Sequence, residues 1–211
     1  MIRKKIDKTK YIINIGDVTK SEISSDVLFI WTSNSLLSGD ETFIKIHKEA
    51  GTPVRRELND IVTEYGNEDG LGKFTFAVTK GAITSSGKLS QYYNLLHCVL
   101  PNYRTERKDT IVSLIKQTIK NAFVYLDLYS EKQVLITKVV ITPLPAKLCG
   151  ELNSKELKEI VDCLIKESSK MKEVQIICTS EEELKLYEDA FLSATVSFWE
   201  KWFIKLFKTN Y

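Results

Sequence analysis

Apolar residues recur along the chain with two spacings, one typical of strands and one typical of helices. Apolar runs predict strands at residues 11–19 (breaking at Gly16), 26–32, 72–83, 92–100, 134–144 and 173–179. Apolar residues three and four positions apart predict helices over residues 41–51, 53–66, 109–129, 153–170 and 180–194. Strands that alternate with helices predict an α/β fold, in which a largely parallel sheet is covered on both faces. Ligands of such sheets bind in the crevice beyond the carboxyl ends of the strands.

Capping residues support these helix limits. Gly51 is suited to end the first helix, and Pro53 is tolerated in the first turn of the second. Asp109 is a good N-cap for the third helix, and either Asn153 or Ser154 for the fourth.

The composition indicates one large domain, to which we assign residues 1–194, and a terminal appendage at residues 195–211. A chain of 211 residues with 43% apolar residues can bury one such core. Thirty basic and 28 acidic residues leave a formal charge of +2. A binding surface built on net charge is therefore not indicated, although nucleic acid is not excluded as a partner.

The cysteines and the termini predict a cytoplasmic protein in a reducing, intracellular compartment. The four cysteines show no CxxC pairing, which favours reduced thiols over a disulfide frame or a zinc site. The basic N-terminus lacks the apolar region of a signal peptide, and no stretch approaches membrane-spanning length.

Several ordered segments resemble the macro domain, a fold known for binding ADP-ribose. Residues 16–19 read GDVT against the family's GDIT, and residues 26–51 align with the family's DAIVNAANSxLxGGGGVxxAIHxAAG. Residues 79–81 and 95–101 follow the later TxG and IIHxVGP segments, and residues 173–191 resemble the family's last strand and helix. The resemblance covers residues 11–194 and implies a three-layer α/β/α fold with a mixed, mostly parallel central sheet.

The departures from the family pattern lie where function is expected. Trp31 stands where the family's enzymes have an asparagine implicated in de-ADP-ribosylation, and Phe43 stands where hydrolases often have an acid. Ser38, Gly39, Asp40 and Glu41 replace the glycines of the first phosphate loop, and only Gly150 survives from the second. Glycines let backbone amides approach a phosphate, whereas two carboxylates bring like charge to it. Lys147 could partly offset that charge or pair with Asp40 or Glu41.

The resemblance implies a set of ligand-binding residues. Asp17 and the Val18 amide would hold adenine, and Asn34 would face the proximal ribose. The two loops at residues 34–41 and 145–150 would flank the diphosphate, which adds Gly39, Lys147, Leu148, Cys149 and Gly150. Each residue also has a structural interpretation: Asp17 and Asn34 as turn residues, Lys147 as a solvated side chain, and Trp31, His47 and His97 as core residues.

We therefore expect a macro-like domain that binds ADP-ribose or a related nucleotide and has no hydrolase activity. No set of acid, base and nucleophile emerges, and we expect no catalytic residue, cofactor or metal. The alternative is an interaction module with a vestigial cleft. Residues 195–211 carry aromatic and basic stripes at helical spacing, which suit a membrane surface, a protein partner, self-association or packing on the domain itself. Residual ADP-ribosyl hydrolase activity is a third alternative.

Overall fold

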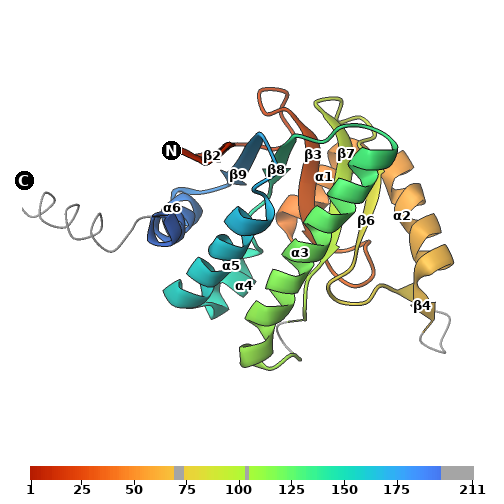
Figure 1. Cartoon of the computed structure of the whole chain (residues 1–211). Coiled ribbons are helices and arrows are strands. Elements are labelled where there is room, and N and C mark those ends of the chain that lie inside the picture. The colour runs from red at the N-terminus through yellow and green to blue at the C-terminus, as the bar shows by residue number, and fades with distance from the viewer. Residues whose placement is uncertain (69–73, 103–104, 196–211) are drawn as a thin grey trace, which may run out of the picture.

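A mixed sheet of seven strands forms the centre of the computed structural model, which describes residues 1–68, 74–102 and 105–195 (Figure 1). The strand order is β1-β2-β9-β8-β3-β7-β6. The strands are β1 (Ile2–Ile6), β2 (Thr9–Ile15), β3 (Ser25–Thr32), β6 (Gly81–Ser85), β7 (Tyr92–Val99), β8 (Lys138–Ile141) and β9 (Glu173–Cys178). The five central strands run parallel, and β1 and β6 pair antiparallel at the two edges. A separate hairpin joins β4 (Asn67–Glu68) to β5 (Phe74–Thr75).

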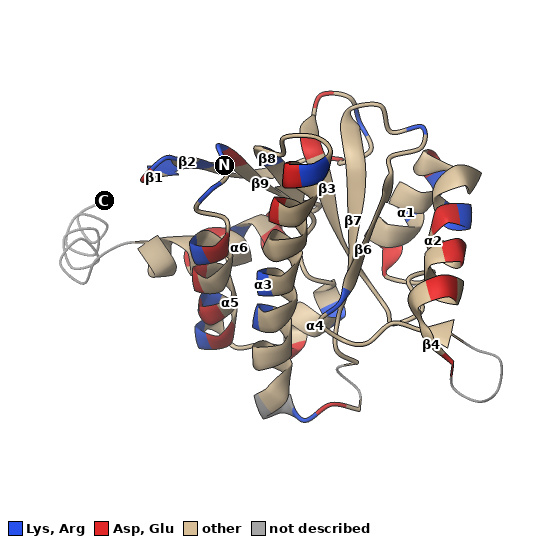
Figure 2. Ribbon diagram, turned by 45° about the vertical axis from the view of Figure 1, so that its right-hand side comes forward, with Lys and Arg blue, Asp and Glu red and all other residues tan. Residues whose placement is uncertain are grey.

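Helices cover both faces of this sheet and make three layers (Figure 1). One face carries α1 (Glu41–Ala50) and α2 (Thr52–Tyr65). The other carries α3 (Lys108–Lys132), α4 (Ala146–Glu151), α5 (Ser154–Glu167) and α6 (Glu181–Thr195). Acidic and basic residues are interspersed along α5, whereas the two arginines of α2 are followed by its acidic residues (Figure 2). The small net charge is thus spread over mixed surfaces.

Strand β3 shows how the sequence builds two apolar cores. Val27, Phe29 and Trp31 pack on the side of α3, α5 and α6, whereas Leu28 and Ile30 pack on the side of α1 and α2. Successive side chains of a strand point to opposite faces, so a strand covered on both sides must be apolar throughout. The three-layer α/β/α arrangement and the mostly parallel sheet are confirmed.

Local capping fixes the helices that lie next to the sheet ends. Gly51 ends α1 with a φ of 87° and donates its amide to the His47 carbonyl. This backbone conformation favours glycine, because a side chain would be strained there. Asn153 and Glu156 form a complete capping box at the start of α5. Of the two caps considered for α5, the structure has Asn153.

Five details differ from the sequence-based expectations. The alternating run at residues 72–83 contains two short strands, β5 and β6, separated by a turn, and β8 occupies only part of residues 134–144. Helix α3 begins at Lys108, so Asp109 lies inside the first turn. Strand β1 was not expected, because its isoleucines are separated by Arg3, Lys4 and Lys5. The segment at residues 145–150, expected as a loop, is largely the short helix α4.

Within the described ranges, no helix has the length and apolarity needed to cross a bilayer. The predicted aromatic extension at residues 195–211 lies outside the described residues except for Thr195, which ends α6. Its predicted roles in a protein partnership, self-association or membrane contact therefore stay predictions.

Candidate functional site

A cavity of about 230 Å³ lies where β2 and β9 end beside the start of α1. These parallel strands end at the same edge of the sheet, where ligands of α/β folds bind. Its walls come from the segment after β2, from α1 and from the end of β9, and are made by Gly16, Asp17, Val18, Thr19, Thr42, Lys45, Ile46, Ile177 and Thr179. Asp17 and Val18, which are adjacent in the chain, thus both line this cavity.

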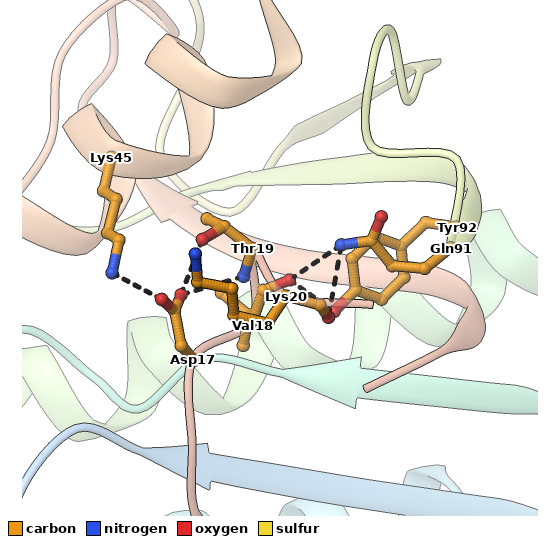
Figure 3. A network of polar contacts seen from close by, with 7 residues as sticks. All are labelled: Asp17, Val18, Thr19, Lys20, Lys45, Gln91 and Tyr92. Carbon is orange, nitrogen blue, oxygen red and sulfur yellow. Dashed lines mark hydrogen bonds and ion pairs between the residues drawn. The ribbon is translucent and has the colours of Figure 1, made fainter. Parts of the chain in front are cut away.

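The Asp17 carboxylate lines this cavity and is held by hydrogen bonds and an ion pair (Figure 3). Its Oδ1 accepts hydrogen bonds from the Thr19 amide at 3.0 Å and the Thr19 hydroxyl at 2.7 Å. Its Oδ2 lies 2.7 Å from Nζ of Lys45, a residue of α1. Burial raises the pKa of Asp17, but the hydrogen bonds from Lys45 and Thr19 and the charge of Lys45 outweigh it and lower the pKa to about 2. Asp17 is therefore a fixed anion at neutral pH.

Val18 is held by the segment that leads into β7, as Figure 3 shows. The Tyr92 hydroxyl donates to the Val18 carbonyl at 2.8 Å, and the Gln91 amide donates to the same oxygen at 3.4 Å. The Val18 amide has no acceptor in the described part of the chain. An amide on a rigid turn beside a carboxylate offers a donor next to an acceptor, the pattern that a nucleobase edge requires.

Hydrogen bonds and close packing within the protein fix the turn between β3 and α1. The Asn34 carbonyl accepts from the Phe76 amide at 2.7 Å, while the exposed Asn34 side chain lies outside the residues that line the cavity. Gly39 is exposed, and a Cβ there would lie 2.6 Å from Cβ and Cγ of Phe43. The Asp40 side chain accepts from the Phe43 amide at 2.9 Å and caps α1. One of the helix amides that a phosphate would use is therefore already bonded to a carboxylate.

A second carboxylate, that of Glu183 in the first turn of α6, lies near the same region. The Thr179 amide and hydroxyl both donate to Oε2 of Glu183 at 2.8 Å, at the start of α6. Burial raises the pKa of Asp40, and the charge of Glu183 raises it further. Two helix N-termini near the cavity thus carry their own carboxylates, and Glu41 beside them is exposed to solvent.

The four candidate residues of the second phosphate loop lie on α4. The amides of Leu148 and Cys149 donate to the Pro145 carbonyl at 2.8 and 3.0 Å, and both side chains are buried in the core. Lys147 and Gly150 are exposed, and nothing lies within 4 Å of a Cβ built on Gly150. Lys147 has no ion-pair partner among the described residues, so the alternative in which it pairs with Asp40 or Glu41 is not formed.

Trp31 and the two histidines belong to the core. The Trp31 indole donates to the Thr142 carbonyl at 2.8 Å, and its ring packs against Phe29. His47 stacks on Phe43 and lies 5.2 Å from His97 between ring centroids. Burial lowers the pKa of His47 to about 4, with a further contribution from Arg55, and burial lowers the pKa of His97 well below its usual value. Both histidines are thus neutral at physiological pH and shielded from solvent.

The four cysteines are buried and free, which agrees with the expected reduced thiols. Burial raises the pKa of Cys149 to about 11, although a hydrogen bond with Tyr187 opposes this shift. A protonated thiol inside the core is a poor nucleophile. The described residues also contain no cluster of histidine, cysteine and carboxylate side chains suited to a metal ion.

Sequence reasoning missed Lys45, Thr42 and Thr179, which line the cavity with Asp17. Lys45 lies 28 positions along the chain from Asp17 and is one of two exposed lysines on α1. Only the packing of α1 over the end of β2 shows that these two charges meet. One signal was present: the family pattern quoted above has alanine where Lys45 stands.

Comparison with known proteins identifies the fold. Neither a protein-family model nor a curated protein sequence matches the chain. Solved structures do match: the Oceanobacillus iheyensis macrodomain with ADP is 17% identical, with a TM-score of 0.75 over 91% of this chain and 95% of that chain. The macro domain of ganglioside induced differentiation associated protein 2 is 14% identical, with a TM-score of 0.67 over 86% of this chain and 82% of that chain.

A third match is the Trypanosoma brucei macrodomain in complex with ADP-ribose, which is 17% identical. Its TM-score is 0.57, over 84% of this chain and 67% of that chain. The chain therefore has the macro-domain fold, as its sequence resemblance implied.

Proposed function

We propose that this protein binds ADP-ribose or a related nucleotide, with the base in the Asp17 cavity, and does not hydrolyse it. The observation that carries this proposal is the cavity itself, which joins the Asp17 anion and the Val18 amide at the carboxyl ends of β2 and β9. Two solved macrodomains similar in fold were obtained with ADP and with ADP-ribose. In this proposal Asp17 accepts a hydrogen bond from the exocyclic amine of adenine, and the Val18 amide donates to a ring nitrogen.

The cavity holds only one end of such a ligand. Its volume of about 230 Å³ is below the roughly 300–1,000 Å³ of pockets that enclose drug-sized ligands. The ribose and phosphates then lie outside it, between the turn that contains Asn34 and Gly39 and the segment that contains Lys147 and Gly150. We assign no side-chain contact to Leu148 and Cys149, because both point into the core.

The lack of hydrolysis is supported by the position of Trp31. Its indole is fully engaged between Phe29 and the Thr142 carbonyl, so it cannot hold a water or a ribose hydroxyl. The neutral histidines and the protonated Cys149 lie in the core and reach no ligand in the cavity. The proposal therefore predicts a reader of ADP-ribose that leaves a modified protein intact.

Thermal unfolding in the presence of ADP-ribose tests this proposal. A ligand that binds only the folded state at 100 times its Kd stabilises the fold by about 2.7 kcal/mol, which raises Tm by about 5–10 °C. The same ligand concentration should raise the Tm of Asp17→Asn clearly less, because a weaker Kd reduces the stabilisation. Glu173→Gln is the matched control, because Glu173 also pairs with a lysine at 2.7 Å but lies outside the cavity. An unchanged Tm of the unmodified protein at millimolar ADP-ribose would contradict the proposal.

A further inference from the structure

Lys45 places a cation inside the cavity, directly beside the Asp17 anion. Its Nζ lies 2.7 Å from Oδ2 of Asp17, and both residues line the cavity (Figure 3). Their side chains are 54% and 27% exposed, so the pair is open to the space that a ligand enters. The exposed side of the cavity thus presents a charged donor and a charged acceptor at hydrogen-bond distance from each other.

The hydrogen bonds already made by Asp17 decide which of its oxygens is available. A carboxylate oxygen accepts about two hydrogen bonds. Oδ1 already has two donors, both from Thr19, whereas Oδ2 has one, from Lys45. A ligand can therefore add a hydrogen bond only at Oδ2, where it must lie next to the ammonium group of Lys45.

We propose that Lys45 donates a hydrogen bond to the edge of the base and Asp17 accepts one from it, so that the cavity accepts 6-oxopurine nucleotides as well as adenine nucleotides. This inference rests on the proposed nucleotide binding and specifies its base selectivity. In hypoxanthine or guanine, the N1–H donates to Oδ2 of Asp17 and the adjacent O6 accepts from Nζ of Lys45. In adenine, the exocyclic amine donates to Oδ2 and one of the two ring nitrogens that flank it, N1 or N7, accepts from Nζ, which leaves the other for the Val18 amide.

Without Lys45, adenine nucleotides and 6-oxopurine nucleotides would no longer bind with similar affinity. The exocyclic amine of adenine still donates to Asp17 when Lys45 is absent. A 6-oxopurine instead brings its O6, which is partly negative, next to a carboxylate that no longer has a cation beside it. Hydrogen bonds to charged groups are worth about 1.5–3 kcal/mol, a factor of about 10 to 100 in Kd. Loss of Lys45 is thus expected to weaken 6-oxopurine binding more than adenine binding.

Two simpler roles for Lys45 make different predictions. If the ion pair is only a surface salt bridge, its loss changes little, because exposed pairs contribute about 0–1 kcal/mol. If Lys45 instead closes the cavity, its removal strengthens the binding of every nucleotide. The selectivity between two bases separates these roles from the one proposed.

The experiment is titration calorimetry of the full chain with ADP and with inosine diphosphate, which differ only at the base edge. The variants are Lys45→Met, which keeps an unbranched side chain one atom shorter and removes its charge, and Lys10→Met as the matched control. Lys10 pairs with Glu173 at the same 2.7 Å and is 49% exposed, but it lies outside the cavity. Circular dichroism confirms that each variant is folded.

We expect the unmodified protein to bind both diphosphates with Kd values within about fivefold of each other, a difference below about 1 kcal/mol. Lys45→Met should weaken inosine diphosphate binding by about tenfold or more and ADP binding by clearly less. Lys10→Met should leave both unchanged. Binding of ADP without inosine diphosphate, or equal effects of Lys45→Met on both, overturns the base-reading role and leaves nucleotide binding intact. If neither ligand binds, the proposed function and this inference fail together.

Discussion

The carboxylate of Asp40 accepts a hydrogen bond of 2.9 Å from the amide of Phe43 and so occupies the N-terminus of α1. A helix N-terminus attracts anions, because its first amides are unpaired and its dipole is positive there. In this chain the anion is supplied by the protein. The phosphates of a nucleotide that lie along this turn would meet a negative charge as well as a smaller set of free amides.

Replacing Asp40 by asparagine should therefore strengthen the binding of phosphorylated ligands. Asparagine is as good an N-cap as aspartate, so α1 keeps its cap while the charge is removed. We expect Asp40→Asn to lower the Kd for ADP-ribose by about three- to tenfold, which corresponds to removal of a partly screened like charge. The Kd for adenosine, which has no phosphate, should stay unchanged. Calorimetry with both ligands measures the difference.

Glu41→Gln is the control for that comparison, because Glu41 is the exposed neighbour of Asp40 and does not cap the helix. It removes one charge from the same turn without changing a hydrogen bond at the helix end. If Asp40→Asn strengthened the binding of ADP-ribose and of adenosine equally, the charge of Asp40 would not act on the phosphates.

Two glycines of the predicted phosphate loops should respond in opposite ways to alanine. A Cβ at Gly39 would lie 2.6 Å from Cβ and Cγ of Phe43, a buried residue that cannot move freely. At Gly150, inside α4, nothing lies within 4 Å of a Cβ. We expect Gly39→Ala to destabilise the fold by about 1–3 kcal/mol and Gly150→Ala to stabilise it by up to about 1 kcal/mol. Urea denaturation compares the two, and a loss of stability at Gly150→Ala would contradict the open surroundings of that residue.

The buried histidine pair predicts a loss of stability in mild acid. The pKa of His47 is lowered to about 4 by burial and by Arg55, so the folded state takes up its proton only far below the unfolded value near 6.5. Between these values the unfolded chain binds more protons, and the free energy of unfolding falls as the pH falls. His97 acts in the same direction. Asp17 does not contribute in this window, because its stabilising effect is lost only below about pH 4.

From pH 7 to pH 5 we expect His47 alone to lower the free energy of unfolding by about 2 kcal/mol. Urea denaturation at the two pH values measures this loss. The chain has two histidines, and both belong to this pair. His47→Gln should therefore be less stable than the unmodified protein at pH 7 but lose clearly less stability on acidification. An equal loss in both proteins would assign the acid sensitivity to carboxyl groups instead.

The sequence was sufficient for the elements whose signals are local. The continuous apolar run of β3 specified a strand covered on both faces, and Gly51 and Asn153 marked helix ends because their side chains, or the lack of one, act within a few residues. The order of strands and helices then predicted the layers. Strand β1 was missed because its charged residues hide an alternation that becomes clear only when β2 pairs with it.

The candidate site was predictable only in part. The ordered motif resemblance pointed to Asp17 and Val18, which the structure joins in one cavity. It could not show that the Asp40 carboxylate accepts from the amide of Phe43, or that residues 146–151 form a helix in which the amides of Leu148 and Cys149 donate to the Pro145 carbonyl. The contact between Lys45 and Asp17 depends on the packing of α1 over the end of β2, a tertiary relationship that the departure from the family's alanine at position 45 does not specify.

The most direct test of the proposed nucleotide binding is calorimetric titration of ADP-ribose into the unmodified protein and into Asp17→Asn. The amide of asparagine keeps the shape of the side chain and an oxygen for Thr19, but it presents a donor instead of Oδ2 to the exocyclic amine of the base. We predict saturable heat with the unmodified protein and a Kd at least about tenfold weaker in the variant. No heat up to millimolar ADP-ribose, or equal affinity in the two proteins, would contradict it.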